Sequence, residues 1–543
     1  MKKTRWIACL IAVLLAVSLF PFGVFAESDD ACLAPVFCGH QETVPVDGVQ
    51  SVRLIALAQN LAGSVLGYEV TVALCDGSIY RTVEFSGAPT EGSTVWGSLL
   101  GNTETGLRTY TAAELAQEHG LEQAAGIFAM VIDKVPTTLG KLVFTVRAYV
   151  KDEAGNKVSS ADSVFVLENG AAAGNVQVLT DADALTEVLN NGKADGSYVV
   201  NTPALDLSGK TYAGLGTKSA PFTGRFDFLG CRLSGLSAPL FPFTKGATVE
   251  NLRVAKTDIE YYDNKGDKWT PYGLIISKMQ GGVVRNILLE KDVQLTVDLP
   301  GENSRIGGIV GIMEKASDTV AISDCISYAT LTTNQSTKIW MGGIVGYINV
   351  GDTIAVTLTR CINYGAVTDN GVGKDSKIAG VLGAAKSKKL VLQYCANYGS
   401  ITSTEKDGQA AGICSYLETG GARAEFCING GTVSGGKFTG GILGYCKFQN
   451  LVVRYCLNLA SVSGENAAQC AAIFGRANGG GVIQSCIALT GSNATLANCS
   501  SGVTVSDSVF CETMDALTER ILASDAMKTV FERSGETVIF VKQ

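Results

Sequence analysis

The chain has 543 residues, a formal net charge of −8, 63 glycines and 17% charged residues. A negative charge of this size repels phosphate backbones and excludes nucleic acid as an expected partner. Abundant glycine with few prolines and few charges favours an all-β protein with many tight bends.

The first 26 residues have the three-part pattern of a secretory signal peptide. A basic start, MKKTR, precedes the apolar run WIACLIAVLLAVSLF, then Pro21 and a small residue, Ala26. An uncleaved membrane anchor is the alternative, although the run is short for a span. Cleavage removes three basic residues and no acid, so the net charge falls from −8 to −11. We therefore predict a secreted protein, associated with the cell surface non-covalently if at all, with no membrane span after cleavage.

The next part of the chain is predicted to be an irregular segment followed by a β-sandwich. Residues 27–44 are polar, and Cys32 and Cys38 are spaced for a local disulfide, with free thiols as the alternative. Residues 45–168 contain alternating runs such as YEVTVAL and KLVFTVRAYV, which predict an immunoglobulin-like β-sandwich. A linker rich in small residues is expected over 169–179.

Residues 180–511 carry two repeated signatures. A short amphipathic helix begins the region, with Thr180 or Asp181 as its N-cap. The first signature, of the form CINYGAV, recurs every 29 to 36 residues, beginning at Cys325, Cys361, Cys395, Cys427, Cys456 and Cys486. The second, of the form GGIVG, recurs in phase with it at 307, 342, 379, 411, 440 and 471. Weaker copies reach back to about residue 238.

A short repeat that cannot bury its own apolar face must stack on its neighbours. The two signatures therefore predict a right-handed parallel β-helix of about eight turns. Stacking would bring one column of asparagines into line, in which amides can hydrogen-bond along the axis and the backbone can take left-handed bends: Asn363, Asn397, Asn429 and Asn458. We expect the cysteine column to face inward as small apolar filler, with an inward-facing isoleucine column beside it as the alternative orientation. A metal or redox ladder and axial disulfides are the alternative roles.

The entry to this region resembles GLUG-motif β-helices. The matching segments are LDLSG, APFTGRFD, LSGL, PLFPF and ATVENLRV between 205 and 254, followed by the later GGIVG and CINYGAV units. The match covers about 198–500 and departs from the motif at FDFLGCRL. The resemblance implies a secreted or surface-anchored bacterial scaffold, adhesin-like or resembling the non-catalytic region of some immunoglobulin A peptidases. It carries over no catalytic residue.

An enzymatic site on a β-helix would need carboxylates from neighbouring turns in one column. The two columns that precede the cysteines from 323 onward contain no repeated acid, and no metal or cofactor motif is present. The most aromatic insertion, DIEYYDNKGDKWTPY, predicts a ligand-binding loop through Tyr261, Tyr262, Trp269 and Tyr272, with an ordinary solvated loop as the alternative. Residues 512–543 are predicted to form a helix and a strand that cap the open end.

The prediction is thus a secreted, non-enzymatic scaffold that binds an extracellular glycan or a surface protein. A carbohydrate-active enzyme with a site built from loops is the first alternative, and a purely structural spacer is the second.

Overall fold

The computed structural model divides into two compact units, residues 1–173 and 174–543. It describes residues 35–42, 49–58, 67–74, 78–86, 94–96, 109–111, 113, 116–117, 126–136, 139, 141–151, 156–160, 162–168, 176–200, 202, 204–228, 231–261, 269–298, 303–316, 318–334, 338–371, 375–447, 450–465, 469–491, 495–499 and 502–541. The predicted signal peptide and Cys32 lie outside these residues, as do Tyr262 and the side chains of Cys38 and Trp269.

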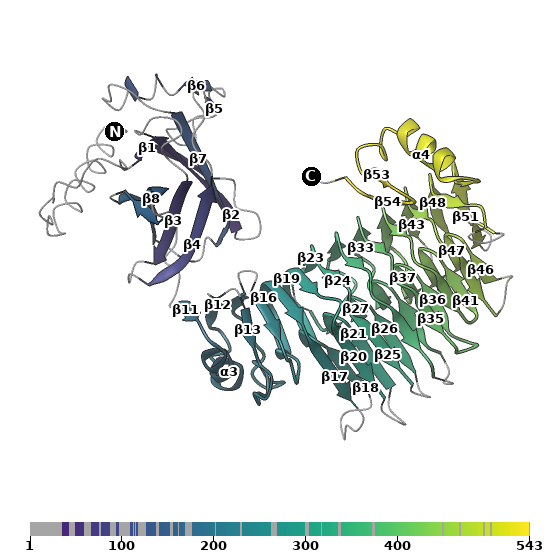
Figure 1. The fold of residues 1–543 in the computed structure, drawn as a ribbon. Coiled ribbons are helices and arrows are strands. Elements are labelled where there is room, and N and C mark those ends of the chain that lie inside the picture. Colours follow the sequence, from purple (N-terminus) through teal and green to yellow (C-terminus); the bar gives the residue numbers. More distant parts are fainter. Residues whose placement is uncertain are drawn as a thin grey trace, which may run out of the picture. The chain divides into compact units, whose positions relative to one another are not determined.

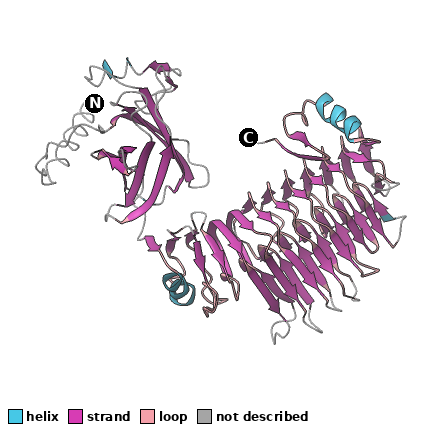
Figure 2. Ribbon diagram, viewed as in Figure 1, coloured by secondary structure: helices cyan, strands magenta, loops and turns pink. Residues whose placement is uncertain are grey.

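The first unit contains two antiparallel sheets, consistent with the expected all-β class (Figure 2). One sheet has the order β1-β2-β7: β1 (Val36–Glu42), β2 (Val49–Ala58) and β7 (Gly126–Pro136). The other has the order β10-β8-β3-β4, with β9 also on β8: β3 (Gly67–Leu74), β4 (Ile79–Ser86), β8 (Lys141–Lys151), β9 (Lys157–Ser159) and β10 (Ser163–Glu168). A separate small pair is formed by β5 (Thr94–Trp96) and β6 (Thr109–Thr111). Strand β1 falls in the segment predicted to be irregular, so residues 36–42 correct that prediction.

The second unit is a parallel β-solenoid of about seven turns (Figure 1). Each complete turn contributes one strand to each of two seven-stranded parallel sheets and one or more segments to a long sheet. The sequence predicted eight turns because the earliest copies, before residue 255, also repeat; their strands join only the long sheet.

The two seven-stranded sheets are regular from end to end. The first comprises β17 (Thr257–Tyr261), β20 (Val293–Val297), β25 (Thr330–Thr333), β30 (Val367–Asp369), β35 (Ile401–Ser403), β40 (Val433–Gly435) and β45 (Val462–Gly464). The second comprises β18 (Trp269–Gly273), β21 (Asn303–Gly307), β26 (Ile339–Gly342), β31 (Lys377–Ala379), β36 (Gln409–Ala411), β41 (Phe438–Gly440) and β46 (Cys470–Ala471).

The long sheet changes character along the axis. Its early strands are β11 (Val176–Leu179), β12 (Ser197–Val200), β13 (Ala204–Asp206), β14 (Arg225–Asp227), β15 (Arg232–Ser234), β16 (Phe241–Ala255) and β19 (Ile276–Leu289). Later turns divide into three short segments each: β22 (Val310–Glu314), β23 (Val320–Ser323), β24 (Ile326–Ser327); β27 (Val345–Asn349), β28 (Val356–Thr359), β29 (Ile362–Asn363); β32 (Leu382–Lys386), β33 (Leu390–Gln393), β34 (Ala396–Asn397); β37 (Cys414–Leu417), β38 (Arg423–Glu425), β39 (Ile428–Asn429); β42 (Leu443–Cys446), β43 (Leu451–Arg454), β44 (Leu457–Asn458); β47 (Phe474–Ala477), β48 (Gly481–Gln484), β49 (Ile487–Leu489); β50 (Ala497–Cys499), β51 (Val503–Ser506), β52 (Val509–Cys511). Since β11 pairs with β12, residues 176–179 belong to the solenoid and not to the predicted linker.

The two ends of the solenoid are finished differently. Helix α3 (Ala182–Asn191) begins at Asp181, whose carboxylate accepts the Ala184 N–H, and its buried residues join the apolar core at the first turns. At the other end, α4 (Met514–Ala523) and the hairpin of β53 (Phe531–Ser534) and β54 (Thr537–Phe540) lie against the outward side chains of the last turns. Inward-facing Val505 of the final turn stays 45% exposed. The described part of the C-terminal segment, residues 512–541, therefore covers a side of the solenoid, which corrects the end cap predicted for 512–543.

Among the described residues, no helix combines the length and apolar character needed to cross a membrane.

Candidate functional site

The asparagine column forms a continuous buried ladder. The side-chain amide of Asn363 donates to the Asn397 Oδ1, Asn397 to Asn429, and Asn429 to Asn458, at 2.9, 2.9 and 2.7 Å. Each amide also donates to the carbonyl two residues ahead in its own turn. Because an unpaired buried amide is costly, this double bonding fixes the register of consecutive turns.

The glycine signature leaves the space that this ladder occupies. A methyl group on Gly380 would overlap the Asn397 side chain, and the same holds for the glycine opposite each other ladder residue: Gly343, Gly412 and Gly441. In the last copy both positions are alanine, Ala472 and Ala488. The two signatures thus run in phase because they contact each other within each turn.

The left-handed bends lie one residue before each cysteine and not at the asparagines. The backbone φ angles there are 51–55° at Asp324, Arg360, Tyr394, Phe426, Tyr455 and Ser485. In the earlier turns Asn251 and Asn286 hold the equivalent bend, at 59° and 53°. The expected left-handed role of the Asn363 column is therefore wrong, since its amides serve hydrogen bonding instead.

All six cysteines of the column are 0% exposed and belong to the solenoid core: Cys325, Cys361, Cys395, Cys427, Cys456 and Cys486. From the second onward, each sulfur lies 3.3–3.8 Å from a carbonyl oxygen of the preceding turn. All six are free thiols, and burial raises the pKa of Cys361, Cys427 and Cys456. Among the described residues, no group of three or more His, Cys, Asp or Glu side chains is placed to hold a metal ion.

The predicted ligand loop is only partly in view. Tyr272 is 3% exposed and belongs to the core, and Tyr261 is half-buried with its ring centroid 4.6 Å from that of Tyr272. Burial raises the pKa of Tyr261. Tyr272 therefore offers no ring face for a sugar, which corrects its predicted role. Trp269 pairs with Asn303 at the start of the β18 sheet.

An outward corner of the solenoid gathers aromatic rings and cations over several turns. It lies where the β18 sheet meets the long sheet at the glycine bend. One column runs in register through the β18 sheet: Arg305, Trp340, Lys377, Gln409 and Phe438. The facing column of the long sheet contains Tyr347, Ala384, Tyr416, Tyr445 and Arg476. We call these residues together the aromatic corner.

The two columns of the aromatic corner contact each other across the bend. The ring centroids of Trp340 and Tyr347 are 4.1 Å apart, and those of Phe438 and Tyr445 are 4.5 Å apart. The Arg305 guanidinium lies 4.8 Å from the Trp340 ring centroid. Cation–π contact and stacking hold these side chains in fixed positions on a rigid scaffold.

Burial shapes the electrostatics of this corner. It lowers the pKa of Arg305 to about 10 and also lowers that of Lys377, which is 2% exposed. Lys377 Nζ lies 2.6 Å from an Asp375 carboxylate oxygen and 4.7 Å from the Tyr416 ring centroid. The Tyr347 hydroxyl donates to the Glu418 carboxylate over 3.3 Å. The rings of Trp340, Tyr416, Phe438 and Tyr445 are half-buried in this corner. They lie on the same surface as charged side chains whose positions are fixed by these contacts.

Sequence reasoning missed the aromatic corner because it aligned the repeats on cysteine. Aligning them on the glycine signature places Arg305, Trp340 and Lys377 two residues before it, and Tyr347 and Tyr445 directly after GGIVG and GGILG. That alignment identifies the members of both columns, and the structure adds that the two columns meet across the bend.

A carboxylate pair in matching register does occur, in turns earlier than those inspected in the sequence. Asp227 pairs with Glu250, and Arg285 follows in the same column. Arg225 and Arg285 each place a guanidinium nitrogen 2.5 Å from a Glu250 oxygen. Burial and the Asp227 carboxylate act to raise the pKa of Glu250, whereas the neighbouring Arg225 guanidinium acts to lower it. Asp227 and Glu250 are at most 1% exposed, so this group is an internal ionic cluster that substrate does not reach.

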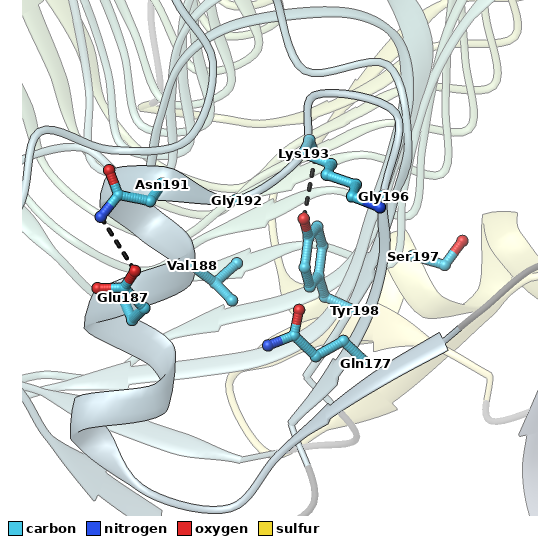
Figure 3. A pocket seen from close by; sticks show the side chains of 9 residues that line it. All are labelled: Gln177, Glu187, Val188, Asn191, Gly192, Lys193, Gly196, Ser197 and Tyr198. Carbon is cyan, nitrogen blue, oxygen red and sulfur yellow. Dashed lines mark hydrogen bonds between the residues drawn. The ribbon is translucent and has the colours of Figure 1, made fainter.

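A hollow of about 500 Å³ lies beside α3 (Figure 3). Its polar groups bond to one another: the Asn191 amide donates to Glu187 over 3.1 Å, and the Tyr198 hydroxyl donates to the Lys193 carbonyl over 3.1 Å. Tyr198 also belongs to the core under α3. These residues therefore serve to hold α3 against the first turns, and we do not assign a ligand to the hollow.

Comparisons with known proteins show a distant structural likeness. No family model matches the chain, and no curated protein sequence matches it. A solved structure described as an IgA1 protease aligns with a TM-score of 0.31 and 14% identity. The alignment covers 76% of this chain and 28% of that protease. A likeness this weak carries no argument about activity, and the GLUG resemblance stays a prediction.

Proposed function

We propose that the protein is a secreted, non-enzymatic binding scaffold whose aromatic corner binds an extracellular glycan. The observation that supports the proposal is that half-buried aromatic rings and the cationic side chains of Arg305 and Lys377 lie in register over several turns of the aromatic corner. Aromatic faces stack on the apolar faces of sugars, and side chains fixed before binding lose little entropy when a ligand arrives. The signal-peptide pattern supports an extracellular location.

The rigid turns also suit an extended ligand. Successive turns present equivalent positions about 4.8 Å apart, so a polymer lying along the axis would meet a repeated surface. Trp340, Tyr416 and Tyr445 contribute three rings to that surface from three different turns. A surface protein is the other ligand class that such a corner can take.

A glycan array probed with the full chain tests the proposal, followed by titration calorimetry with the best ligand. We expect Trp340→Ala and Tyr416→Ala to weaken binding about tenfold each, because aromatic anchors dominate binding energy. Tyr364→Ala is the matched control, since Tyr364 lies on another face at 37% exposure. Equal losses in all three variants, or binding untouched by the corner variants, would contradict the proposal.

The two alternatives predict different results in the same experiment. A carbohydrate-active enzyme would release shortened products from a bound polysaccharide. A structural spacer would bind no glycan in the array.

A further inference from the structure

The C-terminal segment marks out a second surface on the solenoid. Its apolar side chains cover the outward column beside the cysteines in the later turns: Ala396, Ile428, Leu457 and Ile487. The cover includes Leu517 and Ile521 of α4, Phe531 of β53 and Val538 of β54. The segment thus covers this face partly with helix α4 and partly with strand β54, in which the apolar side chains of Val538 and Phe540 occupy alternate positions.

Strand β54 crosses the turn that contains residues 394–398. The Tyr398 hydroxyl donates to the Val538 carbonyl over 2.7 Å, and the Phe540 and Tyr394 rings meet edge to face at 6.3 Å. Val538, early in β54, therefore lies over Tyr398, and Phe540, at its end, lies over Tyr394. The strand runs opposite to the solenoid strand beneath it.

The same outward columns continue into two earlier turns, which the segment only borders: Ile362 packs against the edge of the apolar cluster, and Asp324 and Arg360 share a hollow with the segment. Ile326 and Ile362 are half-buried there, and Tyr364 is 37% exposed. The rings of Tyr328 and Tyr364 are parallel within 9° with centroids 4.6 Å apart, and Tyr364 stacks in turn on Tyr398. The apolar surface beneath β54 is thus continuous with an open one of the same composition.

A hollow of about 350 Å³ lies at the border between the covered and open turns. The solenoid contributes Asp324, Arg360 and Tyr394 to its lining, and the C-terminal segment contributes Thr529, Val530, Phe540 and Val541. Arg360 and Asp324 form an ion pair at its edge, with Nε 2.5 Å from Oδ1.

One edge of β54 faces these open turns. Among the described residues, β54 pairs with β53 alone, and the Val541 N–H donates to the Val530 carbonyl over 2.9 Å. Because hydrogen-bonded and non-hydrogen-bonded pairs alternate in an antiparallel ladder, the backbone groups of Val538 and Phe540 point to the other edge. The bond from Tyr398 to the Val538 carbonyl agrees with that direction. An edge of this kind is a template for another strand.

We propose that this edge binds an extended peptide segment of a partner protein, added as a third strand to the β53–β54 hairpin. The backbone of the segment pairs with Val538 and Phe540, and its alternate apolar side chains pack on Ile362 and Tyr364. Strand addition of this type draws affinity from main-chain hydrogen bonds and specificity from alternate side chains.

The occupant is an isolated strand and not a second copy of this chain. The hairpin of a second copy lies on its own solenoid. If the β54 edges of two copies paired in one plane, both solenoids would lie on the same side of the new sheet. The solenoid of the second copy would then overlap residues 326–364 of the first. Only a segment with nothing attached to its inner face fits over the open turns.

Fluorescence anisotropy with a labelled peptide tests the proposal on the full chain. The probe has the sequence ETVIFVKQ of residues 536–543, since β54 itself fits this face. A matched peptide carries lysine in place of the valine and phenylalanine that correspond to Val538 and Phe540. We expect the first peptide to bind at least about tenfold more tightly than the second, because burying an unpaired charge is costly.

Protein variants locate the site. Tyr364→Ala and the milder Ile362→Thr should each weaken peptide binding about tenfold, as removal of a central apolar anchor does. Tyr445→Ala in the aromatic corner is the control and should leave it unchanged, with thermal unfolding confirming that all three variants fold. The proposal is overturned if the first peptide fails to bind at roughly 1 mM, if both peptides bind alike, or if Tyr364→Ala and Ile362→Thr bind as the control does.

Discussion

The early and late turns of the solenoid share the long parallel sheet but fill their core with different side chains. Aromatic rings fill the first turns: Phe222, Phe226, Phe228 and Phe241 pack with centroid distances of 4.6–6.5 Å. Small thiols and the asparagine ladder fill the later turns. Only the later turns repeat strictly, because each ladder asparagine needs a glycine opposite it. The strict sequence repeat of the later turns therefore reflects the contact between asparagine and glycine, and the solenoid fold itself does not require it.

The outer surface shows the same contrast. One register column contains Asp227, Glu250 and Arg285 in its early turns, where they form the buried ionic cluster. The same column continues outward-facing through Gln393 and Glu425 in the later turns. The following predictions separate the two regions, from the largest expected effect to the smallest.

Glu250→Gln should destabilise the protein by about 3 kcal/mol, because it leaves the guanidiniums of Arg225 and Arg285 without their shared carboxylate. Glu425→Gln, in the same column, should cost less than about 0.5 kcal/mol, since its partner Arg423 is half exposed. Urea unfolding of both variants measures the difference. Equal losses of unfolding free energy in the two variants would show that the buried cluster of the early turns contributes no more to stability than the exposed pair of the later turns.

The contact between glycine and asparagine should appear as a coupling energy. Gly380→Ala overpacks the Asn397 side chain and should cost about 2 kcal/mol. Asn397→Ala leaves neighbouring amides unpaired and should cost a similar amount, about 2 kcal/mol.

The double variant should be more stable than the sum of the two losses predicts, by at least about 1 kcal/mol. It recreates the combination that the last turn carries naturally, Ala472 with Ala488. Strict additivity in the double-mutant cycle would mean that the two signatures run in phase for another reason.

The cysteines of the later turns should behave as packing residues. Cys395→Ala removes one buried sulfur and should cost about 1 kcal/mol, without the larger loss expected for a ligand or a disulfide. Thiol titration of the folded protein should leave the six column cysteines unreactive until denaturant is added. Rapid labelling of Cys361, Cys395 or Cys427 under native conditions, identified by mass spectrometry, would contradict a filler role.

A carboxylate of the early turns should give a modest pH dependence. Hydrogen bonds from Arg232, with Arg253 also in contact, lower the pKa of Glu290 below its ordinary value of 4.5. The group therefore contributes stability above about pH 4.5 that is lost as the pH falls through the lower value of the folded state.

Replacing this carboxylate with Glu290→Gln should cost about 1 kcal/mol at pH 7 and should flatten that part of the acid profile. Lys406→Gln is the control, because Lys406 is 80% exposed and belongs to a later turn. If the acid profile of Glu290→Gln is the same as that of the unchanged protein, Glu290 does not cause the loss of stability at low pH.

The class of fold could be predicted because repeat signatures constrain every turn alike. The stacked amides followed from the spacing of CINYGAV units. That spacing left either the cysteine column or the adjacent isoleucine column to face inward, and the structure confirms the cysteines. The left-handed bends did not, because the residue before each cysteine varies in type from Asp324 to Tyr394, and a backbone angle leaves no uniform side-chain signal there.

The candidate sites depended on contacts that spacing alone does not give. Trp340 and Tyr347 meet across a bend, and this requires knowing that the glycine signature forms a corner. The end cap was predicted for residues 512–543 because the open end of a β-helix exposes strand edges, and this argument does not identify the side of the solenoid as the surface that α4 covers. The aromatic loop was misjudged at Tyr272 because the sequence does not tell which ring of a cluster is buried.

Stacking of consecutive turns in register is the central claim, and spin-label distances test it most directly. Thr357 lies three turns from Val452, four from Val482 and five from Thr504 along one register column. Nitroxides placed pairwise at Thr357 and each of these sites should lie about 14, 19 and 24 Å apart, rising by one strand spacing per turn. Distances that do not increase in this order, or that exceed these values by more than the reach of the labels, would contradict the stacked solenoid and both surfaces built on it.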